Sequence, residues 1–384
     1  MRVLICPDKF KGSLSSGGVA EAIARGIRSV RPDWRLELLP VADGGEGTTD
    51  VLCQVFHGER RAAVVSDALG RPVEAYYGWI GGERPWVALE MSQAAGLWRL
   101  EAGERDPLRA NTRGVGELML AAIRDGATSL CIGLGGSATN DGGSGMARAL
   151  GWKFLDDAGS DLGGLPGELS RLSRIVRGRA VPEITLLSDV ENPLLGDRGA
   201  TAVFGPQKGV TPDGRPILEN ALTRLADVTE AALGKSFRQI PGAGAAGGLG
   251  FGLLAFCGAR IEMGFPWLAR QLDLESKARQ ADVLITGEGC LDAQTAHGKA
   301  PAGIAALARK SGRPVVAFAG RIEVAHGFDA AYSLEEIEPD PQSSMARAAE
   351  LLEARAAQWA GSFRKASKVW PRNRGRAFDA SRSE

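Results

Sequence analysis

The chain has 384 residues, more than the roughly 250–300 at which a single hydrophobic core stops growing, so its length favours two domains. Basic and acidic residues both number 46, which excludes the whole-molecule charge typical of proteins that bind nucleic acid or acidic membranes. Five scattered cysteines without a CxxC pair, no signal-peptide pattern and no apolar run of about 18 residues predict a soluble cytoplasmic protein that does not cross a membrane.

The first sixty residues predict a parallel βα arrangement. Strands are expected at 3–6 and 35–39, and helices at 16–30 and 48–56. From 60 to 91 the pattern changes to short β-type runs at 62–65, 73–80 and 86–89, separated by glycine-rich turns. These runs predict antiparallel strands and mark the beginning of a second domain.

Strands and helices then alternate again. Strands are expected at 130–133, 184–187, 283–286 and 315–319, and helices at 114–124, 144–150, 216–233, into Cys257 and at 301–310. Strand, helix and strand in that order are typical of a parallel sheet. The predicted fold is therefore α/β, with a Rossmann-like domain from residues 1–60 and 275–364, an inserted α/β domain at 61–274 and a disordered basic tail at 365–384.

Polar clusters follow the predicted strands, where the loops of a parallel sheet collect ligands. After the first strand, Asp8, Lys9, Lys11 and Ser13 offer a carboxylate, two ammonium groups and a hydroxyl just before a helix. A capped helix behind a solvated loop is the alternative.

After the second strand, Asp43 and Glu46 are separated by two glycines. Two hard carboxylates beside a phosphate site suit Mg²⁺, which binds few protein carboxylates and keeps several waters. A turn followed by an acidic helix start is the alternative.

Glycine is the outlier of the composition, with 52 residues where the usual share of about 7% gives roughly half as many. The segment GLGGSATNDGG at 133–143 follows a strand and predicts an anion-binding nest of backbone amides and hydroxyls. It is neither a Walker A loop nor a GxGxxG fingerprint. A second glycine-rich segment at 242–250 predicts either another phosphate cradle or close helix packing.

Two more strand ends carry acids. Asp189 follows one strand, and Glu288, Asp292 and Gln294 follow another. Such carboxylates are common as general bases or metal ligands, although a single one can equally be a helix cap. The three histidines lack zinc-site spacing and no GxSxG elbow is present, so zinc hydrolases and serine hydrolases are disfavoured.

Seven motifs, taken in order from about residue 1 to 335, resemble the bacterial glycerate kinase family of the type related to glycerate 2-kinases. They are PDKFKGSLS at 7–15, ADGGEGT at 42–48, GLGGSATNDGGSG at 133–145, SDVENPLLG at 188–196, FGPQKG at 204–209, GAGAAGGLG at 242–250 and ITGEG at 285–289 with DAQT at 292–295. The resemblance implies ATP and Mg²⁺ as cosubstrates, D-glycerate as acceptor, and 2-phosphoglycerate favoured over 3-phosphoglycerate as product. Cys290 departs from the family pattern, which has a basic residue there, so Arg113 or Lys208 would have to compensate.

Phosphoryl transfer needs positioned cations and an acid that takes the acceptor proton, and the clusters offer both. We expect catalytic roles for Asp189 or Asp292 and for Lys11, nucleotide binding by Ser13, Gly135, Gly136, Ser137, Asn140 and Gly244, substrate binding by Asp8, Arg113, Lys208 and Gln294, and Mg²⁺ binding by Asp43 with Glu46 or Glu288.

Two other functions are compatible with parts of the sequence. A NAD-linked dehydrogenase would need GxGxxG directly after the first strand, which PDKFKG does not provide. A silent regulator that binds ATP and a hydroxy acid without turnover is the second. The expected partner is a small-molecule substrate rather than nucleic acid or membrane, and a homo-oligomer remains open.

Overall fold

The computed structural model describes residues 1–42, 44–292, 300–324 and 327–363. The contacts within it divide the chain into two compact units, Met1–Ala42 with Leu268–Glu384, called unit 1, and Asp43–Trp267, called unit 2. The predicted basic tail at 365–384 lies outside the described residues. No helix of the described segments is long and apolar enough to cross a membrane.

Unit 1 is built around a parallel sheet in the order β13-β12-β11-β1-β2. Its strands are β1 (Arg2–Ile5), β2 (Arg35–Leu38), β11 (Val283–Leu291), β12 (Val315–Ile322) and β13 (Ala330–Ser333). Its helices are α1 (Ser16–Val30), α10 (Leu274–Gln280), α11 (Ala300–Lys310), α12 (Pro341–Ala346) and α13 (Ala348–Ser362). The predicted parallel sheet made from both chain ends is confirmed.

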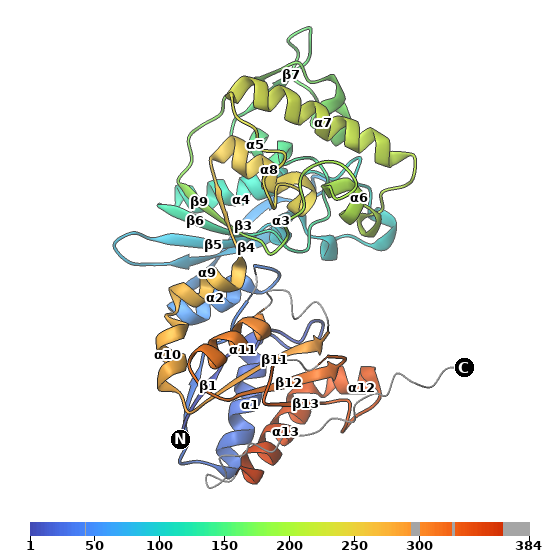
Figure 1. Cartoon of the computed structure of the whole chain (residues 1–384). Coiled ribbons are helices and arrows are strands. Elements are labelled where there is room, and N and C mark those ends of the chain that lie inside the picture. The colour runs from blue at the N-terminus through green and yellow to red at the C-terminus, as the bar shows by residue number, and fades with distance from the viewer. Residues whose placement is uncertain (43, 293–299, 325–326, 364–384) are drawn as a thin grey trace, which may run out of the picture. The chain divides into compact units, whose positions relative to one another are not determined.

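Alternate side chains of these strands enter different cores. Val316 and Phe318 of β12 pack with α1 and α13, which lie side by side (Figure 1). Ala317 and Ala319 belong to a separate cluster, and α11 contacts β11 and β12. This alternation is the two-residue period of a strand buried on both faces.

Unit 2 contains a mixed sheet in the order β10-β9-β6-β5-β4-β3 and a hairpin of β7 and β8. Its strands are β3 (Glu59–Ser66), β4 (Pro72–Ile80), β5 (Trp86–Glu90), β6 (Ser129–Gly133), β7 (Lys153–Leu155), β8 (Arg174–Val176), β9 (Glu183–Leu187) and β10 (Arg260–Glu262). Its helices are α2 (Thr48–Phe56), α3 (Ser92–Ala95), α4 (Arg113–Arg124), α5 (Ser144–Ala149), α6 (Ala200–Phe204), α7 (Gly214–Leu233) and α8 (Ala245–Cys257), and α9 (Gly264–Gln271) runs across the boundary to unit 1. The four 3₁₀ turns are η1 (Leu97–Arg99), η2 (Ala102–Glu104), η3 (Pro166–Arg171) and η4 (Pro206–Lys208).

The antiparallel pairs β3–β4 and β4–β5 confirm the predicted change of pattern after residue 60, and β5, β6, β9 and β10 are parallel. The domain boundary differs from the predicted one, however, because residues 43–60 belong to unit 2. The reason is α2, which packs on β4 and β5. Its Asp50 carboxylate accepts a hydrogen bond of 3.1 Å from the Tyr76 hydroxyl of β4. The second boundary lies at 267/268 rather than 274/275.

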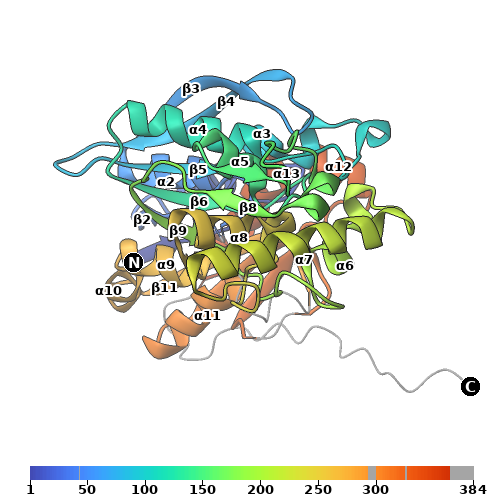
Figure 2. The same ribbon diagram turned by 90° about the horizontal axis from the view of Figure 1, so that it is seen from above.

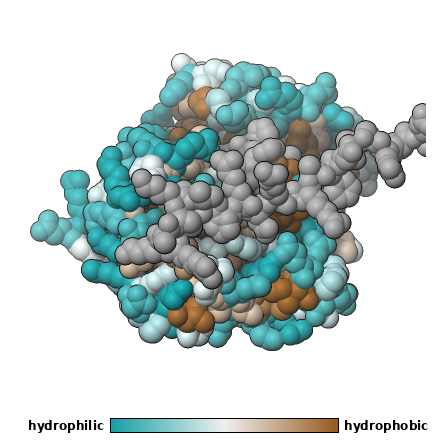
Figure 3. Space-filling model, turned by 60° about the horizontal axis from the view of Figure 1, so that its bottom comes forward, coloured by the Kyte–Doolittle hydropathy of each residue, from teal (hydrophilic) through white to brown (hydrophobic). Residues whose placement is uncertain are grey.

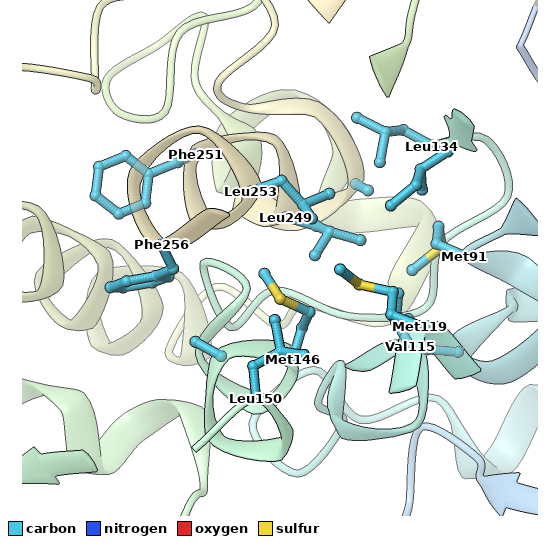
Figure 4. Close-up of a cluster of buried hydrophobic side chains, with 14 of the residues drawn as sticks. Met91, Val115, Met119, Leu134, Met146, Leu150, Leu249, Phe251, Leu253 and Phe256 are labelled. Carbon is cyan, nitrogen blue, oxygen red and sulfur yellow. The ribbon is translucent and has the colours of Figure 1, made fainter. Parts of the chain in front are cut away.

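The core of unit 2 lies between the sheet and the helices α4, α5, α7 and α8. Figure 2 shows α7 and α8 alongside each other, and Figure 4 shows Met119 and Met146 turned toward Leu249 of α8. All three of these side chains are fully buried. On the face seen in Figure 3, most of the coloured residues are hydrophilic and the apolar ones form small separate areas.

Candidate functional site

Three parallel strands of unit 2 end side by side. Glu90 of β5 pairs in register with Gly133 of β6, which in turn pairs with Leu187 of β9. The loops that leave these strands therefore begin at the same edge of the sheet. They contain the predicted Gly135, Gly136, Ser137 and Asn140 after β6, and Asp189 after β9.

We call residues 133–143 the glycine loop. Its first half is held by backbone pairing with the segment after β5: Leu97 N donates to Gly136 O over 2.8 Å, and Ala138 N donates to Ala95 O over 2.9 Å. Gly136 has a φ of +74° and Ser137 is only 8% exposed. The loop therefore has a fixed course at the positions predicted to bind phosphate.

The turn before α2 packs against this loop. A Cβ added to Gly135 would lie 2.8 Å from the Gly45 Cα, so the two backbones are in close contact. Glu46 of this turn is exposed, whereas Asp43 lies outside the described residues. The predicted magnesium pair is therefore described only at Glu46.

Glu90 is a buried acid that the sequence reading missed. Its carboxylate accepts hydrogen bonds from Gly47 N at 3.1 Å and Thr49 N at 2.8 Å, at the start of α2. Burial raises the pKa of Glu90, and these backbone hydrogen bonds oppose the rise. The sequence feature that could have identified Glu90 is its place as an acid at the end of the apolar run of β5.

The second half of the glycine loop is anchored by Asp141, which is fully buried. Its Oδ2 accepts from Thr112 N at 2.9 Å, Thr112 Oγ1 at 2.8 Å and Gly145 N at 2.9 Å, and its Oδ1 accepts from Gly143 N at 3.1 Å. Four hydrogen bonds satisfy the carboxylate almost completely. Asp141 thus has a structural part in the loop.

The glycine loop contains buried polar atoms without a hydrogen-bond partner. Among the described residues, Thr139 Oγ1 and Asn140 Oδ1 are unpartnered, and so is Ser92 Oγ of α3. The Asn140 side chain is oriented by its Nδ2, which donates to Thr201 Oγ1 over 3.0 Å. Unsatisfied buried groups are rare in native proteins, so these atoms are candidates for contacts with a ligand.

Lys208 and Arg113, both predicted to bind substrate, have different surroundings. Lys208 is 1% exposed and its Nζ donates to Thr139 O over 2.8 Å. The Arg113 side chain is on the surface, where its Nε pairs with Glu117 Oε1 at 2.9 Å. Lys208 therefore contacts the glycine loop, and Arg113 is engaged in an exposed helix pair.

The segment from 242 to 248 packs against two loops of the site. A Cβ on Gly244 would lie 2.2 Å from Pro193 O, and one on Gly247 would lie 1.9 Å from Thr139 O. The sequence predicted either a phosphate cradle or close helix packing for this segment, and these contacts show close packing. Asp189, half-buried after β9, accepts a hydrogen bond of 2.9 Å on its Oδ1 from Gly264 N, at the start of α9.

A second group of predicted residues lies in unit 1, where β1 and β11 are neighbours. Asp8, 7% exposed, follows β1, and its Oδ1 accepts from Lys9 N at 2.6 Å. Lys11 is exposed, and the Ser13 hydroxyl donates to Met345 O over 2.6 Å. The loop of Lys11 lies beside β11, because a Cβ on Gly289 would be 3.4 Å from Lys11 N.

Glu288 corrects the predicted end of its strand. β11 continues to Leu291 because it pairs with β12 as far as Leu291 and Ile322, so Glu288 is a buried residue inside the strand. Asp292 directly follows the strand and is half-buried. Gln294 lies outside the described residues. The described residues contain no group of three or more His, Cys, Asp or Glu side chains placed to hold a metal ion.

A basic residue does lie beside Cys290, on the neighbouring strand. Cys290 pairs in register with Arg321 of β12, whose Nη2 is 3.9 Å from the Cys290 Sγ. The Arg321 guanidinium also pairs with Glu323. Arg113 or Lys208 was the expected compensating cation, whereas the cation beside Cys290 is Arg321, which the strand pairing brings there from a distant part of the chain.

The model of the glycerate kinase family matches residues 3–364. The chain belongs to the glycerate kinase family. It is 44% identical to the glycerate kinase of Bacillus subtilis over 382 residues, covering 96% of this chain and 100% of that protein. It is 43% identical to the glycerate 2-kinase of Escherichia coli over 345 residues, covering 87% and 90% of the two chains.

A solved structure shares the fold. The crystal structure assigned to glycerate kinase 2 of Salmonella typhimurium LT2 has a TM-score of 0.84 at 40% identity, covering 94% of this chain and 97% of that one. The predicted family and the two-domain α/β class are confirmed, and the chain is a kinase. As a glycerate kinase family member it uses a nucleotide and a small-molecule substrate. A dehydrogenase is thereby excluded.

Proposed function

We propose that the protein transfers the γ-phosphoryl group of ATP to D-glycerate, with 2-phosphoglycerate as the product. The observation that carries the proposal is the glycine loop, which has a fixed course at the carboxyl end of a parallel strand and contains buried polar atoms that are unpartnered in the described structure. The chain around it matches the glycerate kinase family over residues 3–364. Strand ends of this kind are where nucleotides bind in α/β folds.

In the reaction, one hydroxyl oxygen of glycerate attacks the γ-phosphorus, the bond to the oxygen between the β- and γ-phosphorus breaks, and the hydroxyl proton passes to a carboxylate. We assign the proton acceptor to Asp189 or Asp292. Phosphate contacts are assigned to the amides of Gly135 and Gly136, to the Ser137 hydroxyl and to Lys11, because donors and cations stabilise the charge of the transferring group. Ser13, Asn140 and Gly244 complete the proposed nucleotide contacts.

The acceptor side needs hydrogen-bonding groups and a cation for the carboxylate of glycerate. We assign these contacts to Asp8 and Gln294, and the cation to Arg113, whose planar guanidinium can bind a carboxylate through two parallel hydrogen bonds. Binding there would require Arg113 to leave its exposed pair with Glu117, which is a small cost.

Mg²⁺ fits the donor set in its chemistry, since Asp43, Glu46 and Glu288 present the hard carboxylate oxygens that this ion prefers. Glu46 is exposed, whereas Glu288 is only 8% exposed. We therefore assign the ion to Asp43 and Glu46 before Glu288. When bound, it would neutralise charge on the β- and γ-phosphate oxygens.

The experiment that tests the product is proton-coupled ³¹P NMR of a reaction containing ATP, Mg²⁺ and D-glycerate. In 2-phosphoglycerate the phosphate is attached to a carbon with a single hydrogen, which splits the ³¹P signal into a doublet. In 3-phosphoglycerate the carbon has two hydrogens and the signal is a triplet. A doublet is expected, and a triplet would overturn the assigned hydroxyl while leaving the kinase intact.

A silent regulator is the second candidate, favoured by the departure at Cys290. The position of Arg321 beside Cys290 weakens it, because a cation is present on the next strand. Binding of ATP and D-glycerate without any phosphorylated product would establish the regulator instead.

A further inference from the structure

Lys208 is a lysine without access to solvent. It is the last residue of η4, it is 1% exposed, and its backbone N donates to Gly205 O over 2.9 Å. Its Nζ donates to Thr139 O over 2.8 Å, in the middle of the glycine loop. The side chain therefore joins two segments that lie 69 residues apart in sequence.

The carbonyl that Lys208 holds is also in contact with α8. Gly247 comes so close that a Cβ there would be 1.9 Å from Thr139 O, and Gly247 O accepts a hydrogen bond of 3.1 Å from Gly142 N. Asp141 fixes the next part of the loop with its four hydrogen bonds. Lys208 thus fixes the loop at Thr139, and Asp141 fixes the residues that follow it.

Two side-chain atoms next to the anchored carbonyl have no hydrogen-bond partner. Among the buried atoms that the described residues leave unpartnered are Thr139 Oγ1 and Asn140 Oδ1. A hydroxyl can donate to a phosphate oxygen, and an amide oxygen can accept from a sugar hydroxyl. The loop thus has two buried polar atoms with unused hydrogen-bonding capacity at the position that Lys208 fixes.

The burial of Lys208 disfavours the charged form of its ammonium group. Burial lowers the pKa of the Lys208 ammonium to about 7, and the charge of Asp141 opposes this only in part. A buried ammonium group is costly unless it is well compensated. Its position against the glycine loop therefore points to a use in ligand binding.

We propose that Lys208 is a positioning residue for the nucleotide: its ammonium group holds the Thr139 carbonyl, and through it keeps the Thr139 hydroxyl and the Asn140 amide oriented toward the bound nucleotide. This inference rests on the proposed function, because it takes the glycine loop as the nucleotide site. It replaces the earlier expectation that Lys208 binds the substrate carboxylate, which its burial disfavours.

The test is steady-state kinetics on Lys208→Met, which keeps the apolar stem and removes the donor and the charge. Loss of a charged hydrogen bond weakens an interaction about 10- to 100-fold, so the KM for ATP should rise by roughly that factor while the KM for D-glycerate changes less than about 2-fold. Lys208→Gln retains a hydrogen-bond donor and should recover part of the loss. Lys153→Met, at an exposed position of β7, removes the same charge and should behave like the wild type.

Several results would overturn the inference. A rise confined to the KM for D-glycerate would show that Lys208 contacts the acceptor, and unchanged constants would show that the anchor is dispensable. If both variants failed to fold by circular dichroism, Lys208 would serve folding rather than the nucleotide site. Wild-type turnover is measured first, because its absence contradicts the proposed function and not the role of Lys208.

Discussion

Asp189 and Asp292 are the two carboxylates that compete for the role of base. Asp189 lies two residues after β9 of unit 2, Asp292 directly follows β11 of unit 1, and each is half-buried. Asp189 also accepts the hydrogen bond from Gly264 N, so a helix cap accounts for one of its oxygens. Both therefore have the position expected of a general base.

Replacing each aspartate by asparagine shows which of the two is the base. The amide oxygen of Asp189→Asn can still accept from Gly264 N, so the variant should fold. The variant that replaces the true base should have a kcat about 10²- to 10⁴-fold lower than the wild type, because an amide cannot take the proton. Kinetics on Asp189→Asn and Asp292→Asn measure this, and near-full kcat in both folded variants would refute the assignment.

Substitution of Gly247 tests the close packing between α8 and the glycine loop. Its φ is +67°, and a Cβ would meet Thr139 O at 1.9 Å. Gly258, at the end of the same helix, has a φ of +66° and nothing within 4 Å of an added Cβ. Both alanine variants incur the left-handed strain of about 1 kcal/mol, and only Gly247→Ala adds a clash.

We therefore expect thermal unfolding to show a clearly larger loss of Tm for Gly247→Ala than for Gly258→Ala. Equal losses would mean that the contact with Thr139 relaxes without cost.

Residue types and spacing identified the glycine loop and the acids after the strands. They could not identify the hydrogen bonds that hold these residues, because the partners are distant in sequence: Lys208 is 69 residues from Thr139, and Glu90 is 43 residues from Gly47. Such pairs follow from strand order, which a single sequence does not show.

At the scale of elements, the start of α2 depends on Glu90 of β5. The carboxylate accepts from Gly47 N and Thr49 N, two groups that the helix itself leaves without partners. Glu90→Ala should lower the free energy of unfolding by about 1–3 kcal/mol, the cost of buried groups left unsatisfied. Glu83→Ala, in an exposed turn, should have almost no effect. Urea titration measures both, and a loss below about 0.5 kcal/mol for Glu90→Ala would contradict the capping role.

Apolar runs bounded by turns predicted most strands of both sheets, including the antiparallel β3–β5. The short β10 and β13 were not predicted, since three or four residues give little periodicity. The extension of β11 was missed because Gly287 and Gly289 read as a loop, whereas pairing with β12 keeps them in the strand. The boundary predicted at residue 60 differs from the one at residue 43 because α2 packs with unit 2.

For the molecule as a whole, Lys208 makes stability depend on pH. Burial lowers its pKa from an ordinary 10.5 to about 7 in the folded state. Between these values the unfolded chain binds more protons than the folded chain, so the contribution of Lys208 to stability is full above about pH 10.5 and is lost as pH falls to about 7.

The free energy of unfolding of the wild type relative to Lys208→Met should therefore increase from pH 7 to pH 10, by at most about 1.4 kcal/mol per pH unit. Chemical denaturation at several pH values measures this difference, with Lys153→Met as the reference that keeps the wild-type slope. A difference that does not change with pH would show that Lys208 titrates normally.

The central claim is that this chain phosphorylates D-glycerate. Its most direct test is the rate of ADP release by the purified full-length protein with ATP and Mg²⁺, measured with and without D-glycerate. We predict release that requires D-glycerate, saturates with its concentration and falls to background when glycerol, which lacks the carboxylate, replaces it. ADP release that is absent, or the same with and without D-glycerate, in protein shown to be folded, would contradict the claim.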